Sequence, residues 1–204
     1  MRWLALALVA CSSSGGASHD ATAMGSCGQD LTCAPAIPAG WMGYIALYDG
    51  PDGGAQACGA GFGTDIAAGS ASPTAADATC GACTCGLPVS NVCAASGGDA
   101  TLAAISWGQV GRACTPDLGA ACANGGTCIA AAAPRLLCIQ QTGDAACPTG
   151  SPFATPYVLY GGVTDTRGCT ACTCGNAVMG ACTPSGGAPT GAATPSMPVT
   201  YCCM

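Results

Sequence analysis

The cysteines of this chain recur at a fixed interval of 89 residues. Seven of them have a second cysteine at that distance, although cysteine makes up only about 9 % of the chain and about one such coincidence is expected by chance. The matched positions are Cys33/Cys122, Cys58/Cys147, Cys80/Cys169, Cys83/Cys172, Cys85/Cys174, Cys93/Cys182 and Cys114/Cys203. Because this register needs no gap, it indicates an internal duplication.

Other residues agree in the same register and define the limits of the repeats. Residues 80–86 match residues 169–175 at six of seven positions, and both segments read Cys-x-Ala-Cys-Thr-Cys-Gly. Repeat one therefore covers residues 27–115 and repeat two covers residues 116–204. We expect two tandem homologous domains.

The number of cysteines in each repeat leads to a prediction about their pairing. Repeat one has eight and repeat two has ten, so we expect each repeat to close its own bridges. Cys128 and Cys138 have no counterpart in the shift, and we expect them to pair with each other. The other pairings stay open. The cysteines expected in structural disulfides are Cys27, Cys33, Cys58, Cys80, Cys83, Cys85, Cys93, Cys114, Cys122, Cys128, Cys138, Cys147, Cys169, Cys172, Cys174, Cys182, Cys202 and Cys203.

Composition explains why the fold needs these bridges. Leu, Ile, Val and Phe together number 27, about 13 % of the chain, below the roughly 20 % expected of a chain with a conventional core. Ordering a residue costs roughly 1–2 kcal/mol of backbone entropy. Each disulfide offsets about 2–4 kcal/mol in the loop-entropy model. The composition therefore predicts a small disulfide-rich fold.

The local pattern predicts a mainly β or irregular structure with little helix. Residues 41–48, 102–107 and 157–163 are short runs rich in aromatic and branched side chains, which are typical of strands. Residues 49–54 and 124–126 have the composition of turns. Residues 129–133 could form one helical turn, which Pro134 would end.

The N-terminus has the organisation of a lipoprotein leader. Arg2 precedes an apolar run of eight residues, too short to span a bilayer, which predicts a signal peptide over residues 1–10. The segment Leu8-Val9-Ala10-Cys11 resembles the bacterial lipobox, which implies lipidation of Cys11. Residues 11–26 would then hold the lipidated cysteine and a flexible tether, and two or more acyl chains anchor a protein stably.

The residues after Cys11 refine the expected location. In lipoproteins, Asp directly after the lipidated cysteine favours the inner membrane, whereas Ser12 and Ser13 follow here and imply the outer membrane or cell surface. The alternatives are an ordinary signal peptide, or a start codon placed too far downstream, with Cys11 as one more half-cystine. We expect the chain to be exported.

Charge excludes one class of partner. The chain has no Lys and no Glu, and its ten Asp outnumber its four Arg. Because too few cations are present to neutralise phosphates, we expect no nucleic-acid binding. The expected partners are the membrane, through the acyl chains, and an unknown protein or envelope component.

The duplicated Cys-x-x-Cys-Thr-Cys-Gly block allows two interpretations. Thiolates at this spacing could bind zinc or copper, which makes Cys80, Cys83, Cys85, Cys169, Cys172 and Cys174 the residues of an alternative metal-binding hypothesis. In an oxidising compartment structural half-cystines are favoured. Cys83 and Cys85 would point to the same face of an extended segment and bridge to two different distant partners.

Candidates for catalysis are weak. The single histidine, His19, lies in the predicted tether, and without Glu or Lys the folded part has only Asp as a common general base. We therefore expect no enzyme, no catalytic residues, no metal and no cofactor. Exposed aromatics could instead contact a partner, and the candidates are Tyr44, Tyr48, Tyr157 and Tyr160, although packing in small core clusters is the favoured interpretation of these residues.

Two resemblances complete the sequence evidence. Residues 122–128 look like the Cys-x-Asn-Gly-Gly-x-Cys turn of epidermal-growth-factor modules, but Cys138 lacks the Cys-x-Cys context that follows in those modules. As a whole, the lipobox and the repeated block resemble Cys-rich bacterial surface lipoproteins with tandem Cys-x-x-Cys-Thr-Cys-Gly units. This resemblance implies location and class, and we expect a non-enzymatic surface module.

Overall fold

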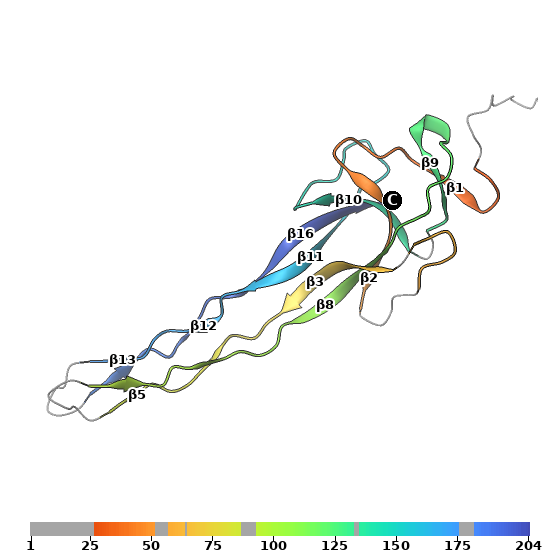
Figure 1. Ribbon diagram of the computed structural model, residues 1–204. Helices are drawn as coiled ribbons and strands as arrows, with labels where there is room; N and C mark the ends of the chain where they lie inside the picture. The colour runs from red at the N-terminus through yellow and green to blue at the C-terminus, as the bar shows by residue number, and fades with distance from the viewer. Residues whose placement is uncertain (1–26, 52–56, 64, 87–92, 133–134, 176–181) are drawn as a thin grey trace, which may run out of the picture.

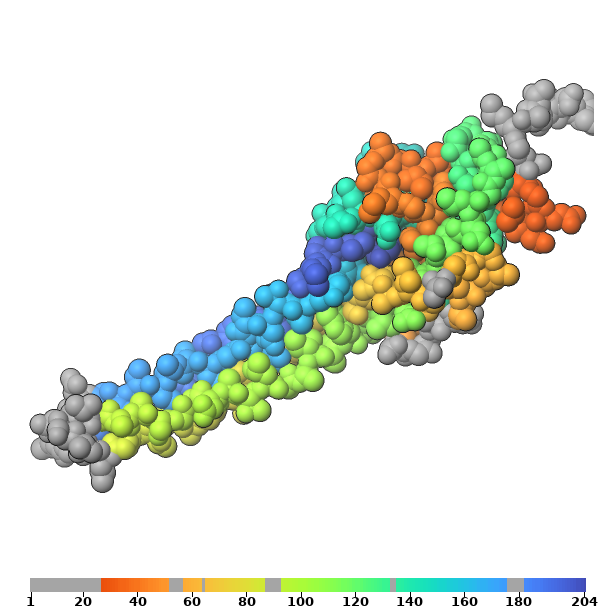
Figure 2. Space-filling view, viewed as in Figure 1, coloured from red at the N-terminus to blue at the C-terminus, as the bar shows by residue number. Residues whose placement is uncertain are grey.

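The protein is elongated, with a head at one end and a narrow shaft that projects from it (Figure 1). The computed structural model describes residues 27–51, 57–63, 65–86, 93–132, 135–175 and 182–204. The predicted signal peptide, Cys11 and the tether lie outside these ranges. In the space-filling view, segments of both repeats run side by side along the shaft (Figure 2).

The head contains a closed barrel of six antiparallel strands, and each repeat contributes three of them. Repeat one provides β2 (Met42–Gly50), β3 (Ile66–Thr74) and β8 (Ser106–Cys114). Repeat two provides β10 (Leu136–Thr142), β11 (Thr155–Asp165) and β16 (Ala193–Cys203). The order around the barrel is β10-β16-β11-β3-β8-β2, so the two sequence repeats share one barrel.

Equivalent strands of the two repeats meet at both seams of this barrel. At one seam β2 pairs with β10, and Leu47 lies opposite Leu136, its own counterpart 89 residues later. At the other seam β3 pairs with β11, where Ser70 lies opposite Tyr160. Contact between like elements at both seams is the arrangement that an approximate two-fold axis produces.

The barrel interior holds the first of two apolar clusters. Leu47 and Leu159 are each 1 % exposed and pack with Ile45 and Tyr201. The Tyr201 hydroxyl donates a hydrogen bond to the carbonyl oxygen of Ala68 at 3.1 Å, so its polar end is satisfied inside the barrel. Strand alternation then directs the intervening residues to the outer face.

A second apolar cluster lies on the outer face of the barrel and is covered by an additional layer. This layer contains β1 (Leu31–Ala34), which pairs antiparallel with β9 (Thr127–Ala130), and the short 3-10 turn η1 (Ala123–Gly125). Tyr44 of β2 and Ile139 of β10 pack there with the fully buried Phe153. Strand β2 is consequently buried on both faces, which explains its continuous apolar run.

Each repeat extends one arm from the barrel, and the two arms form the shaft. Arm one comprises residues 79–86 and 93–101; in it β4 (Thr79–Cys80) pairs with β7 (Ala100–Thr101), and β5 (Thr84–Cys85) pairs with β6 (Ala95–Ser96). Arm two comprises residues 168–175 and 182–190; in it β12 (Gly168–Cys169) pairs with β15 (Pro189–Thr190), and β13 (Thr173–Cys174) pairs with β14 (Pro184–Ser185). All four arm strands of repeat two lie 89 residues after those of repeat one.

The predicted mainly β, disulfide-rich fold is confirmed, with three local errors. The turn predicted at 49–54 starts too early, because Asp49 and Gly50 are the last residues of β2, and residues 52–54 lie outside the described ranges. Strand β2 covers all of the predicted run at 41–48 except Trp41, and β11 covers the run at 157–163, but in the run at 102–107 only the last two residues are in a strand, β8. The helical turn expected at 129–133 is wrong at its start, because Ile129 and Ala130 belong to β9. Among the described residues, no helix has the length and apolarity needed to cross a bilayer.

Candidate functional site

Five disulfides join a cysteine of repeat one to its own counterpart in repeat two. They are Cys33–Cys122, Cys80–Cys169, Cys83–Cys172, Cys85–Cys174 and Cys93–Cys182. A residue can bond to its own symmetry copy only where the two copies meet at the axis. The approximate two-fold axis therefore runs from the head along the shaft, and four of the bridges form a ladder between the arms.

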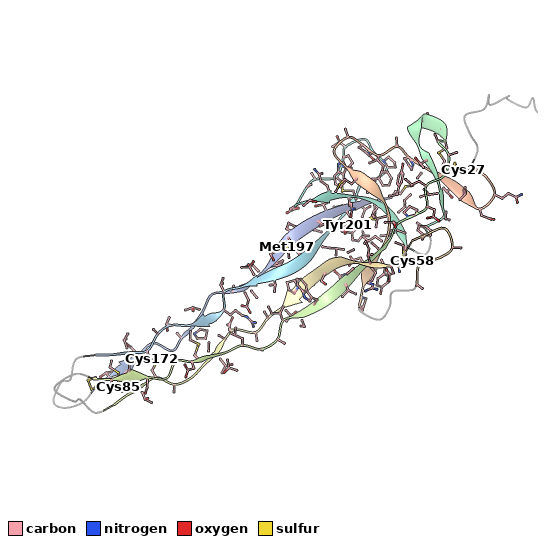
Figure 3. The ribbon with its side chains drawn as sticks, viewed as in Figure 1. Cys27, Cys58, Cys85, Cys172, Met197 and Tyr201 are labelled. Atoms are coloured by element: carbon pink, nitrogen blue, oxygen red, sulfur yellow. A yellow bond between two sulfur atoms is a disulfide. The ribbon has the colours of Figure 1, made fainter. Side chains whose placement is uncertain are left out.

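Strand geometry explains how the ladder forms. Side chains two residues apart on an extended segment share one face, so Cys83 and Cys85 both point toward arm two. They bridge to two different distant residues, as their spacing predicted, but these partners, Cys172 and Cys174, belong to the other repeat. Figure 3 shows Cys85 and Cys172 near the far end of the shaft and Cys27 at the opposite end, in the head.

Two glycines make room for the ladder in a reciprocal way. A Cβ at Gly98 would lie 2.7 Å from Cys172 Sγ, and a Cβ at Gly187 would lie 2.9 Å from Cys83 Sγ. Both residues have positive φ, 77° and 66°, a backbone region that favours glycine. The duplicated Ser-Gly-Gly sequence therefore leaves space for the Cys83–Cys172 disulfide on both sides.

One arginine breaks the symmetry between the repeats. The guanidinium of Arg167, 3 % exposed, donates hydrogen bonds to the carbonyl oxygens of Ala76 at 2.6 Å and Ala103 at 2.9 Å, both in repeat one. It also pairs with Asp165 at 2.8 Å, and the hydrogen bond from Arg167 lowers the pKa of that carboxyl. The counterpart of Arg167 in repeat one is the buried Ala78, so repeat one donates no equivalent hydrogen bonds from this position to repeat two.

The pairing of the cysteines corrects the expectation that each repeat closes its own bridges. Of the nine disulfides in the described part of the chain, six cross between the repeats, the five on the axis and Cys27–Cys128. The expected Cys128–Cys138 pair is also wrong, because Cys138 bonds to Cys203. An even number of cysteines per repeat is equally compatible with an even number of crossing bridges.

The three internal disulfides staple the head. Cys138 and Cys203 lie directly opposite each other on β10 and β16 and bridge inside the barrel. Because successive strand residues point to opposite faces, the adjacent Cys202 bridges outward to Cys147 in the second cluster. In repeat one, Cys58–Cys114 closes the corresponding region.

The sulfurs that could have bound a metal are all bonded to one another in pairs. The six cysteines of the duplicated block form three of the ladder disulfides, which leaves no thiolate among them. In the head, the sulfurs of Cys27, Cys122 and Cys128 lie within 4.8 Å of one another, but they belong to two neighbouring disulfides. In this oxidation state, no sulfur of these groups is available as a ligand.

The aromatic residues proposed as contact residues lie at or next to the head. Tyr44 is 5 % exposed and its hydroxyl donates to the carbonyl oxygen of Pro35 at 2.6 Å, so it is a core residue. Tyr48 donates to the carbonyl oxygen of Pro51 at 3.0 Å, and Tyr157 packs against the barrel cluster. Tyr160 is half-buried on β11 beside the β3 seam.

The head also contains features that the sequence reasoning missed. Asp65 pairs with Arg112 at 3.0 Å and with the buried Arg135 at 3.4 Å, a cluster whose members are far apart in the sequence. A groove of about 500 Å³ opens between the segment at Cys33 to Pro38 and the loop at Pro148 to Pro152, and its lining residues are uncharged.

Comparison with known proteins finds no matching family, no similar curated protein and no similar solved structure. The covalent chemistry nevertheless determines the compartment. Nine disulfides persist only in an oxidising environment, so the protein belongs outside the cytoplasm.

Proposed function

We propose that this protein is a lipid-anchored surface protein of the bacterial cell envelope that acts as a rigid spacer and binding module without catalysis. The observation that carries the proposal is the ladder of four disulfides between the arms. A shaft cross-linked at four levels resists bending and proteolysis, which are properties that a displayed element needs. The lipobox at Cys11 supplies the anchor.

The position of the first described residue supports an orientation for this spacer. Cys27 is bridged to Cys128 of β9 in the head, and the arms leave the head on the opposite side (Figure 1). A tether between Cys11 and Cys27 would therefore hold the head toward the membrane and direct the arms away from it.

The reach of the spacer follows from strand geometry. Twenty residues run from Ile66, at the start of the barrel strand β3, to Cys85, near the far end of the shaft, and at roughly 3.3 Å per residue they span at most about 65 Å. The tether would add on the order of 20 Å if it behaves as a flexible coil. The far end would lie beyond the immediate lipid surface, where a protein or another envelope component could be contacted.

The surface of the arms favours a neutral polar partner. The described arm residues carry one charged side chain, Asp99, and Thr and Ser hydroxyls pair across each arm, at 2.8 Å for Thr84 and Ser96 and 2.7 Å for Thr173 and Ser185. Such a surface offers hydrogen bonds and little electrostatic attraction.

The anchor is tested with Cys11→Ser and with Ser12→Ala as a matched control. We expect the control to incorporate radiolabelled palmitate and to sediment with membranes. The Cys11→Ser protein should incorporate none and appear in the soluble exported fraction. Unchanged membrane retention of Cys11→Ser would refute lipid anchoring.

Display by the shaft is tested with an epitope tag inserted after Gly86, in arm one, and separately after Gly150, in the head. We expect antibody to stain intact cells that carry the arm tag, and more weakly those that carry the head tag. An arm tag that becomes accessible only after permeabilisation would contradict surface display.

A further inference from the structure

The cysteine face of each arm is complementary to a copy of itself. Every bridge of the ladder joins a cysteine to the cysteine 89 residues later, and the contacts of Gly98 and Gly187 with the Cys83–Cys172 bridge are reciprocal. A contact related by a two-fold axis is isologous, which is the same geometry that joins two identical subunits in a dimer. The arms therefore associate as two separate molecules would.

Among the described residues of the shaft, no contact requires both arms to belong to one chain. The repeats are connected through the head, by the segment between β8 and β9, which lies at the opposite end of the molecule from the ladder (Figure 1). Exchange of an arm between two molecules would preserve each bridge of the ladder. Exchange of an element with an identical one is a low-cost route to dimers.

We propose that the arm of a second copy of this chain takes the place of the sister arm, so that two molecules become covalently linked by reciprocal arm exchange. Arm one of each molecule then pairs with arm two of the other. Arg167 selects this pairing, because its donors reach the carbonyl oxygens of Ala76 and Ala103, which belong to repeat one.

Arm exchange leaves the number of disulfides unchanged. Each bridge forms when two thiols lose two electrons and two protons to a disulfide donor of the oxidising compartment, and that donor is reduced to a dithiol. The exchanged dimer contains the same number of bridges as two monomers. Exchange competes with closure inside one chain, where the effective concentration of the sister arm is of the order of millimolar, so it requires crowded chains.

Two complementary variants test the proposal directly. The first has its arm-one cysteines replaced, Cys80→Ser, Cys83→Ser, Cys85→Ser and Cys93→Ser. The second has its arm-two cysteines replaced, Cys169→Ser, Cys172→Ser, Cys174→Ser and Cys182→Ser. Neither can close a ladder alone, and the two carry different affinity tags and are exported from the same cell without reductant.

We expect a covalent heterodimer that withstands SDS and separates on reduction. Mass spectrometry of its unreduced peptides should find the bridges in register, from residue 80 to 169, 83 to 172, 85 to 174 and 93 to 182. Because Arg167 favours unlike arms, heterodimers should exceed either homodimer several-fold. Absence of covalent dimers, bridges out of register, or homodimers as abundant as heterodimers would overturn the proposal.

A second measurement uses the unaltered mature chain, so that poor folding of the variants does not decide the outcome. Unlabelled and ¹⁵N-labelled protein are reduced, unfolded, mixed and reoxidised at increasing concentration. We expect the covalent dimer to increase with concentration and to contain ladder peptides with one labelled and one unlabelled partner. Isotopically pure ladder peptides at every concentration would overturn the proposal.

Discussion

Removal of a middle rung of the ladder should destabilise the protein less than removal of its end rung. The two variants to compare are Cys83→Ala with Cys172→Ala, and Cys93→Ala with Cys182→Ala. Both pairs join counterparts 89 residues apart and all four cysteines are half-buried, so their surroundings are matched. They differ in the size of the ring that each bridge closes once its neighbours are formed.

The expected magnitudes follow from those ring sizes. A lone bridge over 89 residues would contribute about 4.6 kcal/mol in the loop-entropy model. With Cys80–Cys169 and Cys85–Cys174 in place, the middle bridge closes a ring of roughly six to eight residues, worth about 2.3 kcal/mol. The end bridge closes a ring of roughly 18 residues, worth about 3.2 kcal/mol.

The assay is guanidinium unfolding without reductant, followed by far-UV circular dichroism and by tryptophan fluorescence. We expect the end-rung variant to lose about 1 kcal/mol more free energy of unfolding than the middle-rung variant. Both losses should be smaller than the value for a lone bridge. A middle-rung loss equal to or larger than the end-rung loss would refute the assignment of stability to ring size.

Three further substitutions test individual contacts. Arg167→Met should lower the melting temperature more than Arg112→Met, because the Arg167 guanidinium is buried on two carbonyl oxygens. The exposed Arg112 side chain should contribute no more than about 1 kcal/mol. Equal losses of melting temperature would contradict a stabilising role for the Arg167 hydrogen bonds. Gly98→Ala should lower the free energy of unfolding by about 1 kcal/mol or more, because residue 98 has a positive φ and its Cβ would meet the Cys172 sulfur. Gly81 has ordinary space for a Cβ, so Gly81→Ala should change the free energy of unfolding by less than about 0.5 kcal/mol. Burial raises the pKa of Asp49, so the folded state binds this proton more tightly and stability falls as pH rises above about 4. Asp49→Asn should therefore gain stability relative to the parent at pH 7 but not at pH 3, and parallel urea midpoints across that range would contradict it.

The sequence was informative where local geometry alone decides the structure. The short runs of aromatic and branched residues in 41–48 and 157–163 predicted strands, and β2 and β11 are present there. Extended geometry placed Cys83 and Cys85 on one face and required two distant partners, which is observed. These predictions needed no knowledge of which segments pair.

The sequence was not sufficient where tertiary pairing decides. The Ala-rich segment that starts at Ile129 has helical propensity, but pairing of β9 with β1 holds its first residues in a strand. The partner of each cysteine depends on the placement of the two-fold axis, and counting cysteines per repeat carries no information about that axis. The gapless shift contains the needed clue, because identical positions meet only on an axis.

The arms have no apolar core, and this determines what keeps the shaft intact. Among the described arm residues none is fully buried, and the half-buried ones are the eight ladder cysteines with Gly98, Gly168 and Gly187. No arm residue in these ranges has an apolar side chain larger than Ala, apart from Pro and Cys. Burial therefore contributes little there, and the disulfides must supply most of the order. The head retains two apolar clusters, so reduction would release the arms while leaving the barrel its own packing.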